Sequence, residues 1–100
     1  VAEMSDLSPA EQRHCFNILM AVEVAVRECF RPEKVNLASF GNAVPHLHWH
    51  VIPRYLDDRH FPQPVWGQPQ RKSGSSPAPK VDDARLALAI RNAVAEHLSG

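Results

Sequence analysis

Cysteine is scarce in this sequence, and its placement limits what the thiols can do. There are 2 cysteines in 100 residues, Cys15 and Cys29, and no Cys-x-x-Cys pair. Both fall in one predicted helix, where a rise of about 1.5 Å per residue sets them roughly 21 Å apart, too far for a disulfide. We therefore expect two buried free thiols, in the reducing setting of a cytoplasmic protein.

Excess charge of one sign and long apolar runs are also missing. The 11 basic and 11 acidic residues give a formal net charge of +0, which favours neither a nucleic-acid tract nor a polybasic membrane anchor. No apolar stretch approaches the ~20 residues of a membrane span, and no signal-peptide pattern opens the chain. The sequence therefore predicts no nucleic-acid partner and no membrane partner, and its length allows one domain.

Two helices are predicted from capping signals and apolar periodicity. The first begins at Ser8, whose side chain can form a capping box with Glu11. An apolar stripe at spacings of three and four residues follows, and Pro32 stops it. These features predict a helix over 9–30, and a second, moderately apolar helix is predicted over about 83–98.

Two strands are predicted between the helices, over 34–40 and 46–52, because apolar residues alternate there. The five or six residues between them favour an antiparallel hairpin. An irregular segment rich in proline and charge follows at 54–69. A two-stranded hairpin alone is marginal in water, so we expect it to join a larger sheet. The predicted fold class is α+β, with a long helix packed on an antiparallel sheet and a C-terminal helix.

Three of the 6 histidines stand at alternate positions in the second predicted strand: His46, His48 and His50. On a strand such residues point to one face, about 6.6–6.8 Å apart, and the apolar residues between them point to the other. Adjacent imidazoles would each need partners if buried. A functional interpretation of this histidine face therefore competes with a structural one, in which the histidines only form the polar, exposed face of a strand.

Three functional interpretations compete with that structural one: phosphate chemistry, a zinc site and an exposed pH-sensing face. Residues 35–56 contain no Asp, Glu or Cys, and their polar groups include the amides of Asn36 and Asn42. Gly41 allows a ligand to approach the backbone closely. Amides and N–H groups suit anions better than a dication, which favours phosphate chemistry. Arg54 can meet a phosphate or form an ion pair with Asp57 or Asp58.

The segment HLHWHVI, residues 46–52, resembles the histidine-triad (HIT) signature His-φ-His-φ-His-φ-φ, in which φ is apolar. The flanking VNLASFGNAVPHLHWHVIPRY and the later FPQPVW are similar to a bacterial branch near the dinucleoside-polyphosphate hydrolases of that family. The resemblance covers roughly residues 1–66. It implies a nucleotide hydrolase or nucleotidyl transferase that acts at an α-phosphate of a dinucleoside polyphosphate or a nucleoside phosphoramidate.

The resemblance also implies roles for individual residues. His48 matches the nucleophile, which forms a nucleotidyl-histidine intermediate, and His50 matches the histidine that contacts the α-phosphate or leaving group. His46 matches the residue that orients the nucleophile, partly through its backbone carbonyl. The implied nucleotide-binding residues are Asn36, Asn42 and Ala43. No metal ligand is implied and no cofactor is required, although Mg²⁺ can accompany the nucleotide.

The chain departs from the family pattern in two respects. The family fold has strands and a further histidine ahead of the segment that begins at Val1, so we expect 1–67 to be the C-terminal part of a HIT-like domain. A flexible connector is expected at 68–81 and the C-terminal helix at 82–100. Ala43 stands where many relatives have a phosphate-binding Ser, which leaves only its N–H.

Several alternatives remain open from the sequence. A homodimer is the expected assembly, with a nucleotide as the small-molecule partner. The histidines can instead form a zinc-binding face with a structural or binding role, or belong to a catalytically silent nucleotide-binding relative. Trp66 either packs against the hairpin or a partner subunit, or lines the substrate cleft.

Overall fold

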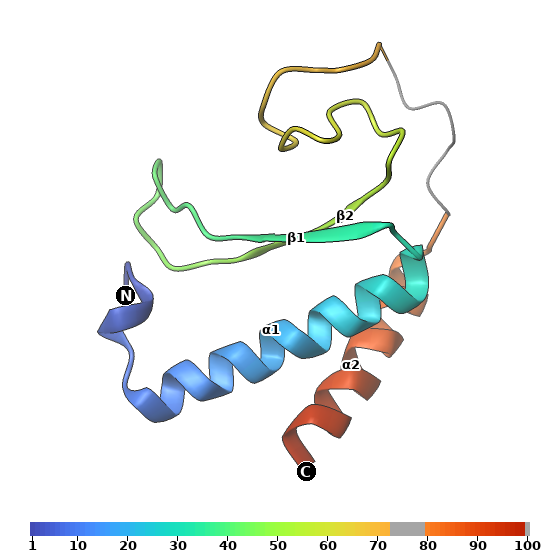
Figure 1. Cartoon of the computed structure of the whole chain (residues 1–100). Helices are drawn as coiled ribbons and strands as arrows, with labels where there is room; N and C mark the ends of the chain where they lie inside the picture. The colour runs from blue at the N-terminus through green and yellow to red at the C-terminus, as the bar shows by residue number, and fades with distance from the viewer. Residues whose placement is uncertain (73–79, 100) are drawn as a thin grey trace.

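The computed structural model describes residues 1–72 and 80–99, so residues 73–79 of the predicted connector lie outside the described residues. The elements, in chain order, are η1 (Met4–Asp6), α1 (Pro9–Phe30), β1 (Lys34–Ala38), β2 (His50–Arg54) and α2 (Asp83–Ser99). Figure 1 shows the β1–β2 hairpin lying along α1, with α2 packed against α1. The irregular segment after β2, residues 55–71, lies on the side of the hairpin away from α1; we call it the arm. The predicted α+β class is confirmed.

Helix α1 has the predicted bounds because its capping groups are both in place. The Ser8 hydroxyl accepts a hydrogen bond from the Glu11 backbone N–H at 3.1 Å, and the Ser8 N–H donates to Glu11 Oε1 at 2.8 Å. At the other end Arg31 takes a left-handed conformation with φ of 46°. The Tyr55 hydroxyl donates to the Phe30 carbonyl at 2.6 Å, which satisfies a backbone group at the end of the helix.

Small side chains form the contact between the two helices. Ala21 and Ala25 of α1 are 0% exposed and Ala93 of α2 is 5% exposed. Alanines let two helices approach closely, and the partly buried Ile90 and Val94 pack beside them. Packing of these side chains therefore holds α2 against α1. The bounds of α2 agree with the predicted 83–98 within one residue.

The hairpin is antiparallel, as predicted, but its strands are shorter and displaced. Its register pairs Asn36 with Ile52 and Ala38 with His50. The predicted strand over 34–40 ends at Ala38, and the one predicted over 46–52 runs from His50 to Arg54. The connection is therefore longer than five or six residues, and His46 and His48 lie in it, ahead of β2.

Two backbone hydrogen bonds made by residues of the connection account for this displacement. The His46 N–H donates to the Val44 carbonyl at 2.7 Å, and the Leu47 N–H donates to the Val1 carbonyl at 2.9 Å. Neither group is then available to β1. Pro53, which lies just beyond the predicted strand over 46–52, is inside β2 opposite Val35. A strand paired on one side can contain a proline, because the missing N–H need not interrupt the ladder.

The alternation of side chains gives the hairpin two different faces. Asn36, Ala38, His50 and Arg54 share one face, and the arm covers its Arg54 end. Val35, 9% exposed, belongs to the other face, toward α1. Within residues 1–72 and 80–99, neither helix combines the length and apolar character that crossing a membrane requires.

Candidate active site

His48 is held by the backbone of His46. Its Nδ1 lies 2.7 Å from the His46 carbonyl oxygen. A carbonyl can only accept a hydrogen bond, so this contact requires a proton on Nδ1. In the neutral imidazole the lone pair then belongs to Nε2. His48 is exposed, so the contact leaves its ring accessible with Nε2 as the basic, nucleophilic atom.

His48 and His50 also lie next to each other. Their ring centroids are 5.2 Å apart and their planes meet at 75°, an edge-on arrangement. His50 is fixed by β2, where it pairs with Ala38. The structure thus brings two imidazoles together, and the contact that involves His46 is made by its main chain. All three histidines are exposed.

Gly41 shapes the loop that holds His48. Its φ is +60°, and a Cβ at this position would lie 3.3 Å from the carbonyl oxygens of both His46 and Val44. The space that a side chain would occupy is therefore crowded by the loop's own backbone. The structure adds a second reason for glycine at this position, because the carbonyl that holds His48 lies against it.

The predicted nucleotide-binding residues lie in two places. Asn42 and Ala43 are exposed in the connection, next to Gly41. Asn36 lies on the His50 face of the hairpin, and its Oδ1 accepts a hydrogen bond from Arg54 Nη1 at 2.7 Å. The Asn36 amide still has two N–H donors, so this contact orients the side chain without using them.

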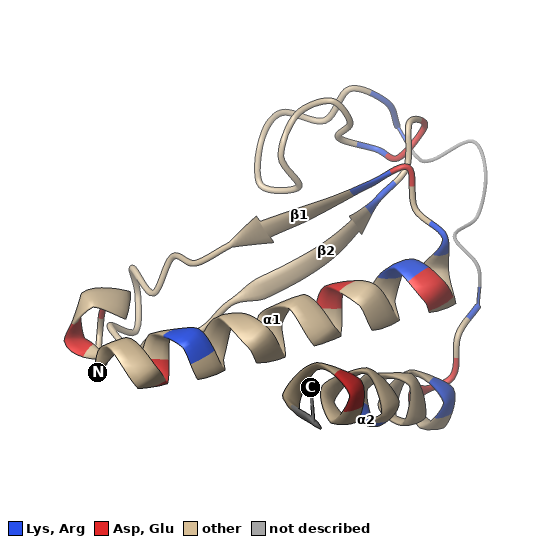
Figure 2. Ribbon diagram, turned by 60° about the horizontal axis from the view of Figure 1, so that its bottom comes forward, with Lys and Arg blue, Asp and Glu red and all other residues tan. Residues whose placement is uncertain are grey.

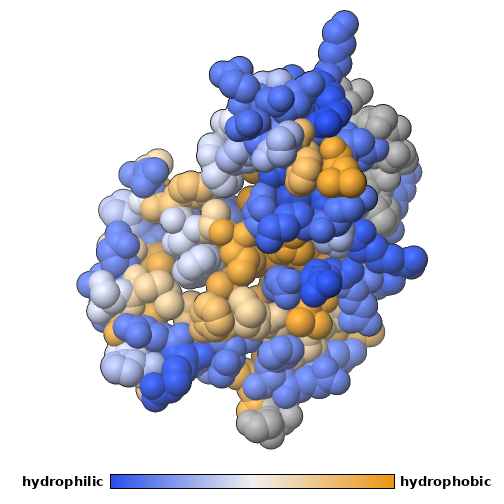
Figure 3. Space-filling model, viewed as in Figure 1, coloured by the Kyte–Doolittle hydropathy of each residue, from blue (hydrophilic) through white to orange (hydrophobic). Residues whose placement is uncertain are grey.

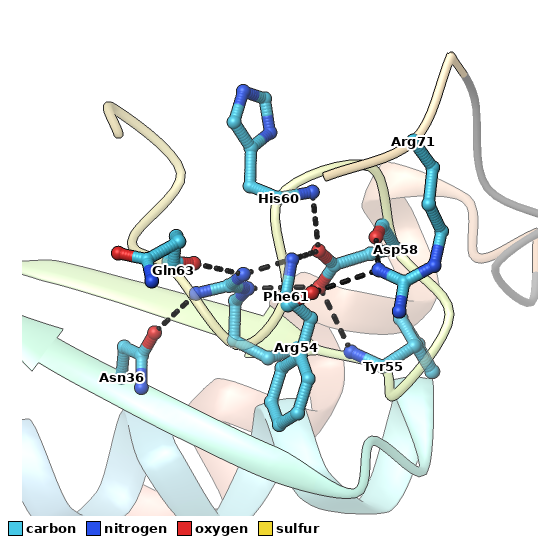
Figure 4. Close-up of polar contacts among 8 residues, drawn as sticks. All are labelled: Asn36, Arg54, Tyr55, Asp58, His60, Phe61, Gln63 and Arg71. Carbon is cyan, nitrogen blue, oxygen red and sulfur yellow. Dashed lines mark hydrogen bonds and ion pairs between the residues drawn. The ribbon is translucent and has the colours of Figure 1, made fainter. Parts of the chain in front are cut away.

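Arg54 is buried, which the sequence did not indicate. Its exposed fraction is 2%, and Figure 4 shows its guanidinium surrounded by hydrogen-bond acceptors. Nε donates to Asp58 Oδ2 at 2.8 Å and Nη2 to Asp58 Oδ1 at 3.1 Å, while Nη2 also donates to the Gln63 carbonyl at 2.6 Å. Of the two roles considered for Arg54, the structure gives it the ion pair, with Asp58.

Asp58 in turn organises the arm. Its carboxylate accepts the backbone N–H groups of Tyr55, His60 and Phe61 at 3.1, 3.0 and 2.7 Å. The hydrogen bonds from Arg54, aided by these backbone donors, hold the pKa of Asp58 far below its ordinary value, although partial burial opposes the shift. Arg71 closes the turn by donating to the Asp58 and Phe61 carbonyls, both at 2.8 Å.

Trp66 of the arm completes a row of rings that begins at the histidines. The ring of Phe40 lies 5.9 Å from that of His50 and 4.6 Å from that of Trp66, the second contact being edge-on at 83°. Phe40 is 45% and Trp66 56% exposed. The structure places Trp66 against Phe40, just beyond β1, and the Trp66 ring keeps a large accessible surface.

The chain segment that carries the histidines has no charged side chain. Residues 35–53 contain no Asp, Glu, Lys or Arg, and Figure 2 shows charged residues collected at the opposite end of the hairpin and along the helices. Hydrophobic residues reach the surface over the hairpin (Figure 3). Among the described residues no three His, Cys, Asp or Glu side chains are grouped so that they could hold a metal ion.

Fold and histidines together define a histidine-triad type of α+β domain. The sequence pattern of the HIT domain family matches residues 1–57, more than half of the chain. The chain belongs to the HIT domain family.

Known proteins similar to this chain agree with that assignment. A bis(5'-adenosyl)-triphosphatase of Saccharomyces cerevisiae is 33% identical over 60 residues, 55% of this chain and 29% of the yeast protein. A histidine triad protein from Bradyrhizobium japonicum is 31% identical, with a TM-score of 0.65 over 97% of this chain and 66% of that one. A histidine triad protein from Marinobacter aquaeolei is 28% identical, with a TM-score of 0.64 over 99% and 66%. The chain thus spans less than a third of the yeast protein's length.

Proposed function

We propose that this chain is a nucleotide hydrolase that cleaves at an α-phosphate through a nucleotidyl-histidine intermediate on His48. The observation that carries the proposal is the 2.7 Å contact between His48 Nδ1 and the His46 carbonyl. The similar yeast protein is called a bis(5'-adenosyl)-triphosphatase, which supports a dinucleoside polyphosphate as substrate. A nucleoside phosphoramidate is the second substrate class.

The first step forms a bond between His48 Nε2 and the α-phosphorus. The bond from that phosphorus to the leaving group breaks at the same time, and the leaving group takes its electron pair. His50, when protonated, is close enough to His48 to give the departing atom a proton. The nucleotidyl-imidazole carries a positive charge, and the His46 carbonyl at Nδ1 favours that charge.

The second step hydrolyses the intermediate. Water attacks the α-phosphorus, and the bond between phosphorus and His48 Nε2 breaks. The water proton passes to His50, which lost its own proton in the first step, so both imidazoles return to their starting states. His46 acts throughout as a positioning residue, through its main chain.

Three residues are proposed to bind the nucleotide. An N–H of the Asn36 amide can donate to a substrate oxygen, because Arg54 occupies only its Oδ1. The Asn42 amide and the Ala43 backbone N–H, both exposed, can donate to phosphate oxygens. No cofactor is proposed beyond Mg²⁺ that arrives with a nucleotide.

We also propose that the active form is a homodimer in the cytoplasm. The described sheet has two strands, and each then has one edge that the described residues do not pair. The free thiols of Cys15 and Cys29 suit a reducing compartment. Sedimentation of the full chain tests the dimer: a particle of twice 11.2 kDa is expected, and a monomer at micromolar concentration contradicts it.

Intact-mass analysis after incubation with a slowly hydrolysed substrate analogue tests the mechanism. The wild type should gain the mass of one nucleotidyl group, and His48→Ala should gain none and lose turnover while still binding nucleotide. His14→Ala, an exposed histidine on α1, is the matched control and should behave as wild type. Turnover that survives His48→Ala contradicts the proposal.

The same samples separate the alternatives. Nucleotide binding without turnover or adduct in the wild type identifies a silent binding relative. Stoichiometric zinc in the purified protein, with loss of structure on chelation, supports the zinc face instead.

A further inference from the structure

We propose that Trp66 and Phe40 form a stacking subsite for a nucleobase of the substrate, beside the reacting histidines. The inference deepens the proposed function and rests on it. It names a part of the substrate, an aromatic base, and the side chains that recognise it.

The first support is the exposure of both rings. Trp66 is 56% and Phe40 45% exposed, although the two touch each other at 4.6 Å. Their edge-on contact leaves a ring face of each unused by the other. Large aromatic surface is normally removed from water, where burial is worth about 25 cal/mol per Å². A surface of this kind beside a reactive group is well suited to a flat, π-bonded ligand.

The second support is position. The Phe40 ring lies 5.9 Å from that of His50, the residue proposed to face the α-phosphate or leaving group. The row from His48 through His50 and Phe40 to Trp66 is continuous, with successive centroid distances of 5.2, 5.9 and 4.6 Å. A base attached to the reacting phosphate through a ribose, or through a ribose and further phosphates, is long enough to reach the end of this row.

The third support is a hollow at the same place. A cavity of about 500 Å³ runs between β1 and the arm, and its lining includes Asn36, Ala38, Pro62, Pro64 and Trp66. Apolar walls and one amide make a surface suited to a base, which stacks through its faces and hydrogen-bonds at its edge. Val35, Leu37 and one charged residue, Lys34 at the end of β1 away from Phe40, complete the lining.

The arm fixes Trp66 in this position. The hydrogen bonds that the buried Arg54 donates to the Asp58 carboxylate and the Gln63 carbonyl anchor the arm on both sides of Pro62. Trp66 follows Gln63 by one short turn, which the Gly67 N–H closes on the Pro64 carbonyl at 2.8 Å. Hydrogen bonds therefore hold the segment that carries the Trp66 ring. A base that stacks on this ring loses little binding free energy to ordering of the side chain.

Trp66→Leu removes the π surface and keeps an apolar side chain, so it is the test variant; Val65→Ala, at an exposed neighbour, is the control. With a dinucleoside polyphosphate, Trp66→Leu should raise KM about tenfold, because stacking of one base is worth roughly 1–3 kcal/mol, and should leave kcat nearly unchanged. Phe40→Leu should act in the same direction, which guards against a folding defect in one variant.

Fluorescence gives a readout that is independent of turnover. A methylene-bridged dinucleoside polyphosphate should quench the emission of the wild type, and the quenching should disappear in Trp66→Leu, which retains Trp49. Inorganic triphosphate, which has no base, should not quench. If a mononucleotide substrate also shows a raised KM in Trp66→Leu, the stacked base belongs to the transferred nucleotide; if only the dinucleotide does, it belongs to the leaving group.

The inference is overturned if Trp66→Leu leaves KM and quenching unchanged in an active enzyme. It is also overturned if the variant changes only the oligomeric state, since Trp66 would then serve a subunit interface. Quenching that depends on Trp66 in a chain without turnover has the opposite meaning: it supports the stacking subsite and contradicts the hydrolase mechanism.

Discussion

Arg54 and Asp58 form a two-pronged ion pair, with Nε and Nη2 of the guanidinium 2.8 and 3.1 Å from the two carboxylate oxygens. The Asp58 side chain is 24% exposed and that of Arg54 only 2%. This geometry satisfies both charges and directs the chain from β2 into the arm. It also makes the arm depend on a single carboxylate.

Removal of that carboxylate should destabilise the fold. Asp58→Ala leaves the buried Arg54 charge without its counter-ion, and breaking a buried pair from one side typically costs about 3 kcal/mol of the free energy of unfolding. Urea unfolding followed by circular dichroism measures the loss. The control variant Asp83→Ala, at an exposed site on α2, should change the free energy of unfolding little. An equal decrease in both variants would contradict a stabilising role of the Arg54–Asp58 ion pair.

Acid should weaken the same contact. The pKa of Asp58 is lower in the folded state than its ordinary value of 3.8, so the pair stabilises the fold fully at pH values above the pKa of the unfolded chain. The contribution is lost as the pH falls below about 4 toward the folded-state pKa. Wild-type stability should therefore fall more steeply between about pH 4 and pH 2 than that of Asp58→Asn, and identical slopes would contradict the assignment.

Gly41→Ala should disturb the reactive histidine more than the fold. The new Cβ would meet the His46 carbonyl oxygen at 3.3 Å, and the positive φ adds strain. Together these two effects should lower the free energy of unfolding by about 1 kcal/mol. Displacement of that carbonyl also changes the hold on His48. We expect kcat to fall about tenfold or more while the melting temperature drops by a few degrees. Ser39→Ala, in the same connection, is the control, and an unchanged kcat in Gly41→Ala would separate the carbonyl from catalysis.

The contact between α1 and α2 should not tolerate a larger side chain. Ala93 is 5% exposed and packs with Ala21 and Ala25, so Ala93→Leu must push the helices apart, at a cost of about 1–3 kcal/mol. Ala95→Leu places the same side chain on an exposed site of the same helix and should be nearly neutral. Thermal unfolding of the two variants measures the difference, which should vanish if α2 is not held by this contact.

Local signals in the sequence were sufficient for the helices. Ser8 and Glu11 lie three residues apart and can cap only a helix that begins between them, and Pro32 excludes a helix beyond Arg31. These constraints act within a few residues, so the pattern alone places Pro9–Phe30 correctly.

Strand ends and buried charge depend on partners that are distant in the chain. The alternation of histidines with apolar residues predicts an extended segment, but hydrogen bonds with Val1 and Val44 decide where the ladder begins. The burial of Arg54 likewise depends on Asn36 and Gln63, which lie 18 and 9 residues away. No local pattern carries that information, so the sequence left the role of Arg54 open.

The uncharged stretch from residue 35 to residue 53 has a consequence for how this surface meets anions. Histidine is the only residue type in it that can become cationic near neutral pH. The stretch itself contains no lysine or arginine that would supply a permanent positive charge. A protonated histidine would therefore serve two purposes on this surface: its charge attracts a phosphate, and its proton is available to a leaving group.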